Sequence, residues 1–326
     1  MFKLVGNPAE HGPLDISMSQ AATWPAVPGL TGMAFHALLM GDERAGPYLA
    51  LAAIPPRTDP MPLYPPHGHG TDTWRITLRG EMNMGARKYL PGEFRYQAGG
   101  KAYGGDDLAW GPDWGYSIVL MADRRGTPSF APDRNPEFIR WARARRKPLF
   151  DWLGIEMVED YTAPQGVATT LKSAPRSFMA EASFHDVSAW HEVTPGVRVA
   201  VGMLGERDVG PVLLHVRAEP GQVAFPASTF ATEVLHIGIA GTLRIGDRDL
   251  AEGDLRLVDE RTPGSAAVAG TAGGCTTIVF GDRRALTDEG IRAAGLPAAW
   301  ETFLRDSLAQ LRPRLGLGLG KAASAA

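Results

Sequence analysis

Apolar and polar positions alternate over short stretches of this sequence, and the alternation predicts antiparallel strands. WRITLRG (74–80) has period two, EMNMGARKY (81–89) carries a glycine where a hairpin would turn, and LPGEFRYQ (90–97) returns after a Pro-Gly turn. Period two places successive side chains on opposite faces of a sheet, while Gly and Pro-Gly mark the turns. We therefore expect an all-β fold of short strands and tight turns.

The same pattern occurs twice along the chain. Residues 75–97 align with residues 236–258 without a gap, so that Gly80 falls on Gly241. The preceding segments GDERAGPYLALAAIPP and GERDVGPVLLHVRAEPG also correspond, as do the closing segments YSIVLMADRRG and CTTIVFGDRRA. Self-similarity of this extent predicts two tandem domains with one fold.

Two segments have helical rather than strand patterns. Between the halves, RNPEFIRWARARRKPLFDWLG (134–154) offers Asn135 as a cap and Pro136 at the first helical position. Near the end, LPAAWETFLRDSLAQLRPRLG (296–316) has apolar residues at helical spacing. We therefore expect a first β-domain at 1–130, a helical linker at 131–180, a second β-domain at 181–290, and a C-terminal helix with a disordered tail at 291–326.

Charge and cysteine content narrow the function classes. The 33 basic and 36 acidic residues nearly balance, so no global field favours nucleic acid or an anionic membrane, and we interpret the basic run at 140–148 as a solvated helix face. The single cysteine, Cys275, excludes an internal disulfide framework and a Cys-rich metal site. With no apolar stretch long enough for a membrane span or a signal peptide, we expect a cytoplasmic protein that acts on a small molecule.

The segment YPPHGHGTDT (64–73) carries the strongest chemical signal. On an extended strand, residues i and i+2 point to one face, so His67 and His69 can reach a single metal ion. The flanking glycines leave room for an ion, and the preceding prolines stiffen the approach. The alternative is a pair of solvated loop histidines.

The tandem β-repeats, the Gly-closed hairpins and the His-x-His ahead of a strand resemble a bicupin. In the first cupin signature, His67, His69 and Gly80 fit, whereas the expected Glu falls on Thr73, next to Asp72. The second signature should supply a further His, and FRYQAGGKAYGG (94–105) has none. Gln97 and Tyr103 are the nearest polar residues to that position. The resemblance implies two cupin-type double-stranded β-helix, or jelly-roll, barrels.

The sequence leaves open which residues supply the remaining metal ligands. Asp72 could complete a two-His, one-carboxylate site and take part in catalysis, or it could stabilise a turn. His36 could point inward as a ligand, or it could be an ordinary core histidine. Such a donor set suits a divalent transition metal, with Fe(II) favoured and Mn, Ni, Co or Zn as alternatives.

Substrate contacts are expected on the strands around this motif. Arg75 is a charged residue in its strand, and apolar packing does not explain its presence there. It could clamp a carboxylate or enolate. Alternatively, it is a surface residue paired with Glu81 or Glu93. Trp74 and Gln97 are further candidates for substrate binding. Tyr103 could serve as a catalytic acid or base beside an ion.

The second half lacks the same donors. In the gap-free register, His67, His69, Asp72 and Arg75 correspond to Ser228, Phe230, Glu233 and His236. One Glu and one His cannot build the same chelate, so we expect the second barrel to bind no metal.

Metal chemistry in the first barrel is the function that the sequence favours. The resemblance implies an O2-dependent dioxygenase acting on an anionic or enolic substrate, or a non-redox lyase, isomerase or decarboxylase. A non-catalytic cupin that senses or binds a small ligand is the competing class. Because cupins often pair through their sheets, the resemblance also implies a possible homodimer.

Overall fold

The computed structural model describes residues 14–24, 34–41, 46–56, 61–62, 68–69, 71–84, 87–99, 106–109, 112–123, 128–129, 179–205, 210–311 and 316–318. They form two compact units. The first, here called the first barrel, comprises the described residues of Met18–Leu39 and Glu43–Glu181. The second barrel comprises those of Asn7–Ser17, Met40–Asp42 and Ala182–Ala326.

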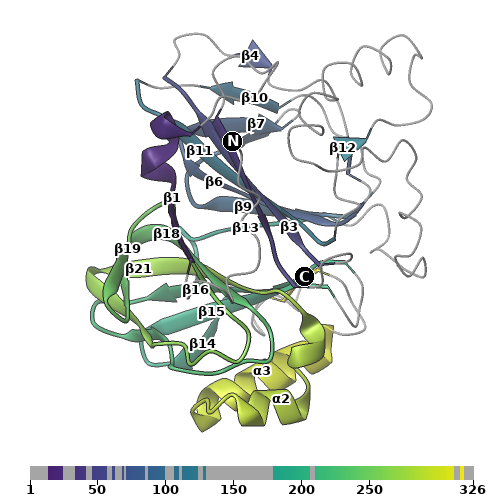
Figure 1. Ribbon diagram of the computed structural model, residues 1–326, viewed down its shortest axis with the longest axis vertical. Helices are drawn as coiled ribbons and strands as arrows, with labels where there is room; N and C mark the ends of the chain where they lie inside the picture. The colour runs from purple at the N-terminus through teal and green to yellow at the C-terminus, as the bar shows by residue number, and fades with distance from the viewer. Residues whose placement is uncertain are drawn as a thin grey trace. The chain divides into compact units, whose positions relative to one another are not determined.

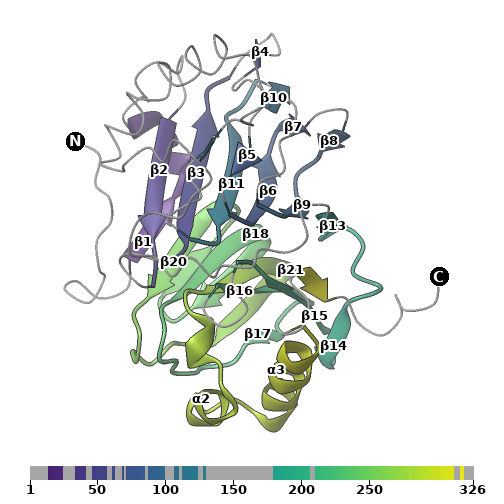
Figure 2. The same ribbon diagram turned by 90° about the vertical axis from the view of Figure 1, so that its right-hand side faces the viewer.

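The first barrel contains a six-stranded antiparallel sheet and a smaller four-stranded sheet. The large sheet has the order β13(Met179–Ser183), β9(Glu93–Gln97), β6(Thr73–Arg79), β11(Gly115–Met121), β3(Tyr48–Ile54) and β2(Ala34–Leu39), and its strands lie side by side in Figure 2. The small sheet, whose strands are labelled in Figure 2, has the order β4(Met61–Pro62), β10(Asp106–Ala109), β7(Glu81–Met84) and β8(Arg87–Tyr89). A short strand, β5(Gly68–His69), pairs with β12(Pro128–Ser129), and the 3-10 helix η2 spans Met18–Thr23.

Strand β6 of the first barrel has one polar and one apolar face, as the alternation predicts. Arg75 of β6 donates to Sδ of Met84 on β7 at 3.2 Å, so the polar face of β6 is turned toward the small sheet. That face is the interior of the barrel. The opposite face carries Trp74, Ile76 and Leu78, which are buried as well. Because β6 is buried on both faces, its polar residues are enclosed by the fold.

The second barrel is built on one extensively paired sheet. Its main order is β1(Leu14–Ser17), β20(Asp254–Val258), β18(Val234–Ile245), β21(Ala267–Phe280), β16(Val212–Ala218), β15(Val197–Met203) and β14(His191–Thr194). Three shorter strands, β17(Val223–Phe225), β19(Arg248–Leu250) and β22(Gly316–Gly318), pair with β21, β18 and β15. One strand comes from outside the expected domain: β1 falls in the segment assigned by sequence to the first barrel, yet it pairs with β20.

The C-terminal helix expected from the sequence is present in the second barrel. Helix α2(Asp288–Ala293) follows the 3-10 turn η4(Arg283–Ala285) and is capped by Thr287, whose hydroxyl accepts a hydrogen bond from the Gly290 N–H at 3.1 Å. Helix α3(Ala298–Leu311) buries one face in the barrel core through Trp300, Phe303, Leu304, Leu308 and Leu311. Figure 1 shows α2 and α3 together at one end of this barrel. The helical linker expected at 131–180 lies outside the described residues, except for residues 179 and 180.

The strands confirm the repeat in register. β6, β7, β8 and β9 correspond to the two halves of β18, to β19 and to β20, in the alignment that matches Gly80 with Gly241. Both of these glycines have positive φ, 79° and 67°, at the bend between the two strand segments. The all-β fold of two tandem barrels is therefore confirmed, and each barrel has its own buried core.

Candidate functional site

His69 lies on β5 of the first barrel, where it pairs with Pro128, and only 5% of its surface is exposed. A buried histidine is the kind of residue that a metal site requires, but His67 and Tyr103 lie outside the described residues. Within the described ranges, no three His, Cys, Asp or Glu side chains gather closely enough to hold one ion. Of the His-x-His pair, only His69 lies among the described residues.

Asp72 is buried directly before β6 and joins three strand ends. Its Oδ1 accepts a hydrogen bond from the Gly99 N–H at 2.8 Å, after the end of β9, and its carbonyl accepts from the Ala122 N–H at 2.9 Å, after β11. Gly99 permits this approach, because a Cβ there would lie 2.8 Å from the backbone carbon of Thr71. One carboxylate oxygen of Asp72 is thus engaged in holding the strand ends together.

Arg75 is an interior residue rather than a surface one. It is 6% exposed and contacts Met84, whereas the two glutamates considered as its surface partners contact other cations. Glu81 accepts from Lys88 at 2.6 Å, and Glu93 lies 4.0 Å from Arg87. The guanidinium of Arg75 therefore places a positive charge inside the first barrel, because arginine stays protonated even when buried.

Arg95 is a second interior arginine, which the sequence reasoning missed. It is the register partner of Arg75 across β6 and β9, it is 8% exposed, and its Nη1 donates to the Tyr89 hydroxyl at 3.4 Å. Its Nη2 contacts Sδ of Met179, and within the described part of the chain its Nε has no hydrogen-bond partner and its guanidinium forms no ion pair. The alternation in EFRYQ (93–97) was a usable signal, since it places Arg95 on the same face as Gln97.

Two like charges opposite each other on neighbouring strands are unfavourable, and burial raises the cost. Arg75 and Arg95 occupy that arrangement on the interior face of the first barrel. Gln97 is two residues from Arg95 on the same face, is 5% exposed, and pairs with Thr73. Together these residues make this face of β6 and β9 polar and give it two positively charged side chains, and guanidiniums are groups that can bind a small anion.

Trp74 and His36 lie on the other face of the large sheet. Trp74 pairs with Tyr96, is fully buried and packs beside Phe94 with ring centroids 6.3 Å apart. The row of register partners Ile76, Ile118, Leu51 and His36 belongs to the same apolar face. His36 packs edge-on against Trp24 at 5.3 Å. The sheet therefore separates these two predicted site residues from Arg75, Arg95 and Gln97.

Comparisons with known proteins identify the architecture. No protein-family model and no curated protein sequence matches this chain. Among solved structures, it is similar to a Nostoc punctiforme protein described as a "putative dioxygenase", with 11% identity, a TM-score of 0.51 and coverage of 84% of each chain. The chain has a bicupin fold.

Weaker similarities extend to other proteins. Salicylate 1,2-dioxygenase from Pseudaminobacter salicylatoxidans is 11% identical with a TM-score of 0.47, covering 82% of this chain and 83% of that one. The 11S allergen of Cocos nucifera is 14% identical with a TM-score of 0.43, and the similarity covers 81% of this chain and 90% of that one. At such low identity the comparisons concern the fold alone.

The second barrel of this bicupin differs from the first at the corresponding positions. His236 occupies the place of Arg75, and Arg256 occupies the place of Arg95, again as register partners. Arg256, unlike Arg95, is paired with carboxylates: its Nη1 lies 3.3 Å from Asp247, and its Nε lies 3.9 Å from Asp15 on β1. The second barrel thus neutralises its interior arginine with its own acidic residues.

His215 and Cys275 of the second barrel have structural surroundings. His215 is fully buried, its Nδ1 lies 2.9 Å from the Thr277 hydroxyl, and its ring packs against Phe184 and Trp190. Burial lowers the pKa of His215 to about 3. Burial raises the pKa of Cys275 to about 11, opposed by the charge of Arg217, so its thiol is protonated at neutral pH. Neither group is prepared for nucleophilic or acid–base chemistry.

Proposed function

We propose that the first barrel is a metal-dependent active site for a small organic anion, with dioxygenase chemistry. The observation that carries the proposal is the buried pair Arg75 and Arg95 on the interior face, beside Gln97. Such a pair is stabilised when an anion lies between the two guanidiniums. The second barrel supports this interpretation by contrast, because Arg256 has carboxylate partners within its own unit.

The residues of the first barrel fit a divalent metal ion in part. His69 is buried, as is its counterpart Phe230 in the second barrel. His67 and His69 would hold the ion, with Fe(II) favoured, and Asp72 would be the carboxylate ligand. When bound, such an ion supplies Lewis acidity and, in the case of iron, redox chemistry with O2.

The chain's own residues would bind and orient the substrate. The planar guanidiniums of Arg75 and Arg95 present paired N–H donors that match the two oxygens of a carboxylate. Gln97 can donate to or accept from a neighbouring hydroxyl of the substrate. Tyr103 remains our predicted acid or base. His36 and Trp74 are left out of this site, because they lie on the opposite face of the sheet.

We favour dioxygenase over lyase chemistry because the sequence offers few further ligands beside the His-x-His pair, which would leave coordination positions for O2 and a bidentate substrate. The description of the similar Nostoc protein agrees with this choice. No helix among the described residues is long and apolar enough to cross a membrane. A cytoplasmic location and a homodimer stay predictions from the sequence.

Metal analysis and oxygen consumption test the proposal. Protein purified without a histidine tag should contain close to one equivalent of a transition metal, and less than about a tenth of an equivalent after reconstitution would reject the metalloenzyme. With the metal present, O2 uptake should begin on addition of hydroxylated aromatic carboxylates or enolic acids. Turnover of the same compounds under strict anaerobiosis would instead assign a lyase, isomerase or decarboxylase.

A further inference from the structure

Arg95 is contacted on both of its terminal nitrogens by side chains of neighbouring strands. Nη2 contacts Sδ of Met179 on β13, and Nη1 donates to the Tyr89 hydroxyl on β8 at 3.4 Å. The Tyr89 hydroxyl in turn donates to Oε1 of Glu181, which also belongs to β13. Met179 and Glu181 are two residues apart, so on an extended strand their side chains share one face. β13 is the neighbour of β9 in the large sheet, as Figure 2 shows, and it therefore supplies groups on both sides of Arg95.

The Tyr89 hydroxyl has one hydrogen, and its two neighbours determine the direction of that hydrogen. A carboxylate only accepts hydrogen bonds, and a guanidinium only donates them. The phenol therefore donates to Glu181 and accepts from Arg95. Tyr89 is 1% exposed, so bulk solvent has little access to this hydroxyl. The three groups form a chain of hydrogen bonds with a single direction, from guanidinium to carboxylate.

Glu181 is held from the other side by an exposed arginine. Nη1 of Arg87 pairs with Oε2 of Glu181, and the guanidinium carbon of Arg87 lies 4.9 Å from the centroid of the Tyr89 ring. Glu181 thus uses one oxygen for an exposed cation and the other for the buried phenol. Its ion pair is with Arg87, and it reaches Arg95 only through Tyr89.

The second barrel shows the same position without the phenol. In the repeat alignment, Tyr89 corresponds to Leu250 and Arg95 corresponds to Arg256. β1 is the end strand beside β20, as β13 is the end strand beside β9, and Oδ1 of its Asp15 lies 3.9 Å from Nε of Arg256. In each barrel the end strand therefore supplies a carboxylate, directly to Arg256 but through a phenol to Arg95.

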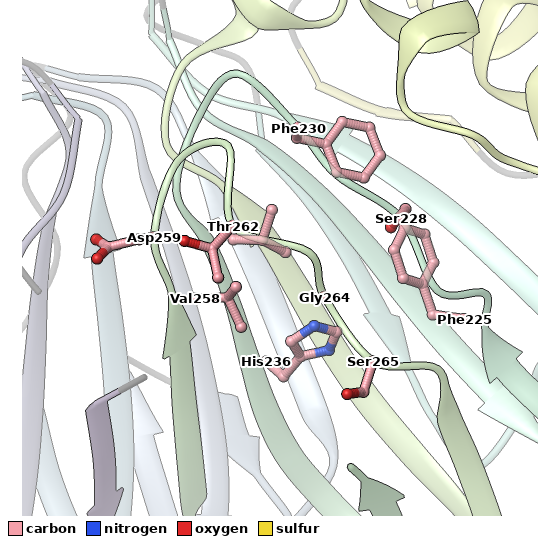
Figure 3. A pocket seen from close by; sticks show the side chains of 10 residues that line it. Phe225, Ser228, Phe230, His236, Val258, Asp259, Thr262, Gly264 and Ser265 are labelled. Carbon is pink, nitrogen blue, oxygen red and sulfur yellow. The ribbon is translucent and has the colours of Figure 1, made fainter. Parts of the chain in front are cut away.

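The residue opposite this arginine differs as well. In the second barrel it is His236, whose ring centroid lies 6.2 Å from that of Phe225 (Figure 3). Burial, and to a lesser extent the charge of Arg256, lowers the pKa of His236 to about 4, so its ring is neutral at pH 7. In the first barrel, Arg75 is opposite Arg95. The first barrel thus has two cations at this pair where the second has one, and its carboxylate is one hydrogen bond further from the arginine.

We propose that Tyr89 is a positioning residue for the anion site of the first barrel. With Glu181 as its acceptor, the Tyr89 hydroxyl fixes the orientation of the Arg95 guanidinium and keeps the carboxylate out of direct contact with it. A substrate carboxylate then meets an arginine that is already ordered and has no acidic side chain to displace. The inference rests on the proposed function for its anion, but the ordering of Arg95 can be measured without any substrate.

Nuclear magnetic resonance of the full-length protein labelled with 15N-arginine measures this ordering. The Arg95 signals are assigned by their loss in Arg95→Met, and rotation about the Cζ–Nη bonds should be slow in the wild type. Tyr89→Phe keeps the ring and its contact with Arg87 but removes the hydroxyl. The rotation should then become about 5-fold faster, as expected for the loss of one hydrogen bond. An unchanged rotation rate in Tyr89→Phe would overturn the proposal.

The matched control is Tyr116→Phe. Tyr116 is another buried tyrosine of the same sheet, and its ring lies 4.8 Å from the guanidinium carbon of Arg79. The substitution removes a buried hydroxyl but leaves the surroundings of Arg95 intact, so the rotation of Arg95 should stay at the wild-type rate. Faster rotation of Arg95 in Tyr116→Phe as well would mean a general loosening of the sheet and would overturn the proposal.

Two variants of Glu181 keep the test available if Tyr89→Phe does not fold. Glu181→Gln keeps an oxygen that can accept from the phenol, so the slow rotation of Arg95 should be retained. Glu181→Leu removes that acceptor, so the rotation should become faster. Both variants remove the ion pair with Arg87 equally. Equal rotation rates in the two variants would contradict the role of Glu181 as the acceptor and would overturn the proposal.

Binding of benzoate, used as a carboxylate probe, separates this inference from the proposed function. Measured by isothermal titration calorimetry, the Kd of benzoate should rise about 5-fold in Tyr89→Phe and stay unchanged in Tyr116→Phe. Faster rotation of Arg95 with an unchanged Kd would mean that Arg95 is not ordered for an anion, and would overturn the proposal. Faster rotation in Tyr89→Phe without any benzoate binding to the wild type would reject the proposed anion site and uphold Tyr89 as the residue that orders Arg95.

Discussion

Two pairs of corresponding residues show how a single position is used differently in the two barrels. Arg75 and Arg95 are register partners on one face of the first barrel's large sheet, and His236 and Arg256 are register partners in the second barrel. Arg256 is balanced by Asp15 and Asp247. Arg95 instead contacts the Met179 thioether and the Tyr89 hydroxyl, and that hydroxyl is in turn hydrogen-bonded to Glu181. The two barrels therefore share a strand register but differ in whether a carboxylate contacts this arginine directly.

Replacing Arg95 by Met should raise the stability of the protein and lower its activity. The variant removes a buried charge opposite Arg75, so the free energy of unfolding of the ligand-free protein should rise by about 1 kcal/mol. Because half of the carboxylate clamp is lost, kcat/KM should fall by about 10- to 100-fold. Urea unfolding and steady-state kinetics measure the two effects. The control is Arg198→Met, which changes an exposed arginine of the second barrel that pairs with Glu192. It should change the free energy of unfolding and kcat/KM only slightly. Unchanged kcat/KM in Arg95→Met would remove Arg95 from the site.

His215 should make the protein less stable in mild acid. The native state holds it neutral with a pKa of about 3, against about 6.5 when unfolded, so the unfolded state binds the proton first as the pH falls. Stability should therefore decline from about pH 6.5 toward pH 3, by about 2 kcal/mol at pH 5 from this residue. Urea unfolding at pH 7 and pH 5 measures the decline. It should shrink in His215→Phe and persist in Thr277→Val, which removes the hydroxyl partner but keeps the imidazole. An equal decline in His215→Phe would assign it to other groups.

At the scale of elements, the barrels depend on a few sharp bends. β18 continues through Gly241 to form two strand segments, which in the first barrel are the separate strands β6 and β7. A side chain at Gly241 would require positive φ and would bring Cβ within 2.3 Å of the Gly273 carbonyl oxygen. The N-terminal strand β1 also matters at this scale, because its Asp15 supplies a carboxylate to Arg256 and Arg248.

Substitution of Gly241 by Ala should therefore lower the free energy of unfolding by more than the strain of a positive φ alone would. Gly295 has a similar φ of 73°, but a Cβ there would meet nothing within 4 Å. Gly295→Ala should lower the free energy of unfolding by about 1 kcal/mol, the typical cost of positive φ. Gly241→Ala should lower it by about 3 kcal/mol or more, because the backbone of β21 must also move. Chemical denaturation of both variants measures the difference, and equal losses would contradict the close approach.

At the scale of the whole molecule, two copies of one architecture carry different interiors. Both barrels have the same strand register, yet the His-x-His of the first is replaced by Ser228 and Phe230 in the second. Phe230 packs with Phe225 and Phe280 in the core of its barrel. Phe230 is thus part of an apolar core, and our proposal assigns the metal chemistry to the first barrel only.

Metal stoichiometry tests this division. The wild-type chain should bind one transition metal ion, and a His67→Ala, His69→Ala double variant should bind none while keeping the native circular dichroism spectrum and cooperative unfolding. The fold should persist because the buried core of each barrel is formed by apolar side chains. Metal analysis by mass spectrometry gives the count. Loss of cooperative unfolding would mean a structural metal site, and residual metal in the folded variant would point to ligands elsewhere.

The sequence by itself determined the strands, the repeat and its register, because period-two alternation and glycines at bends are local properties of the chain. It also identified His69, Arg75 and Gln97 as polar residues on or next to strands, and all three are buried. The tertiary structure decided which face of the sheet is the interior. That choice brought Arg95 beside Arg75, turned Trp74 and His36 to the opposite face, and joined Asp72 to Gly99. These outcomes depend on packing between sheets and on contacts between residues far apart in the sequence, which local patterns do not encode.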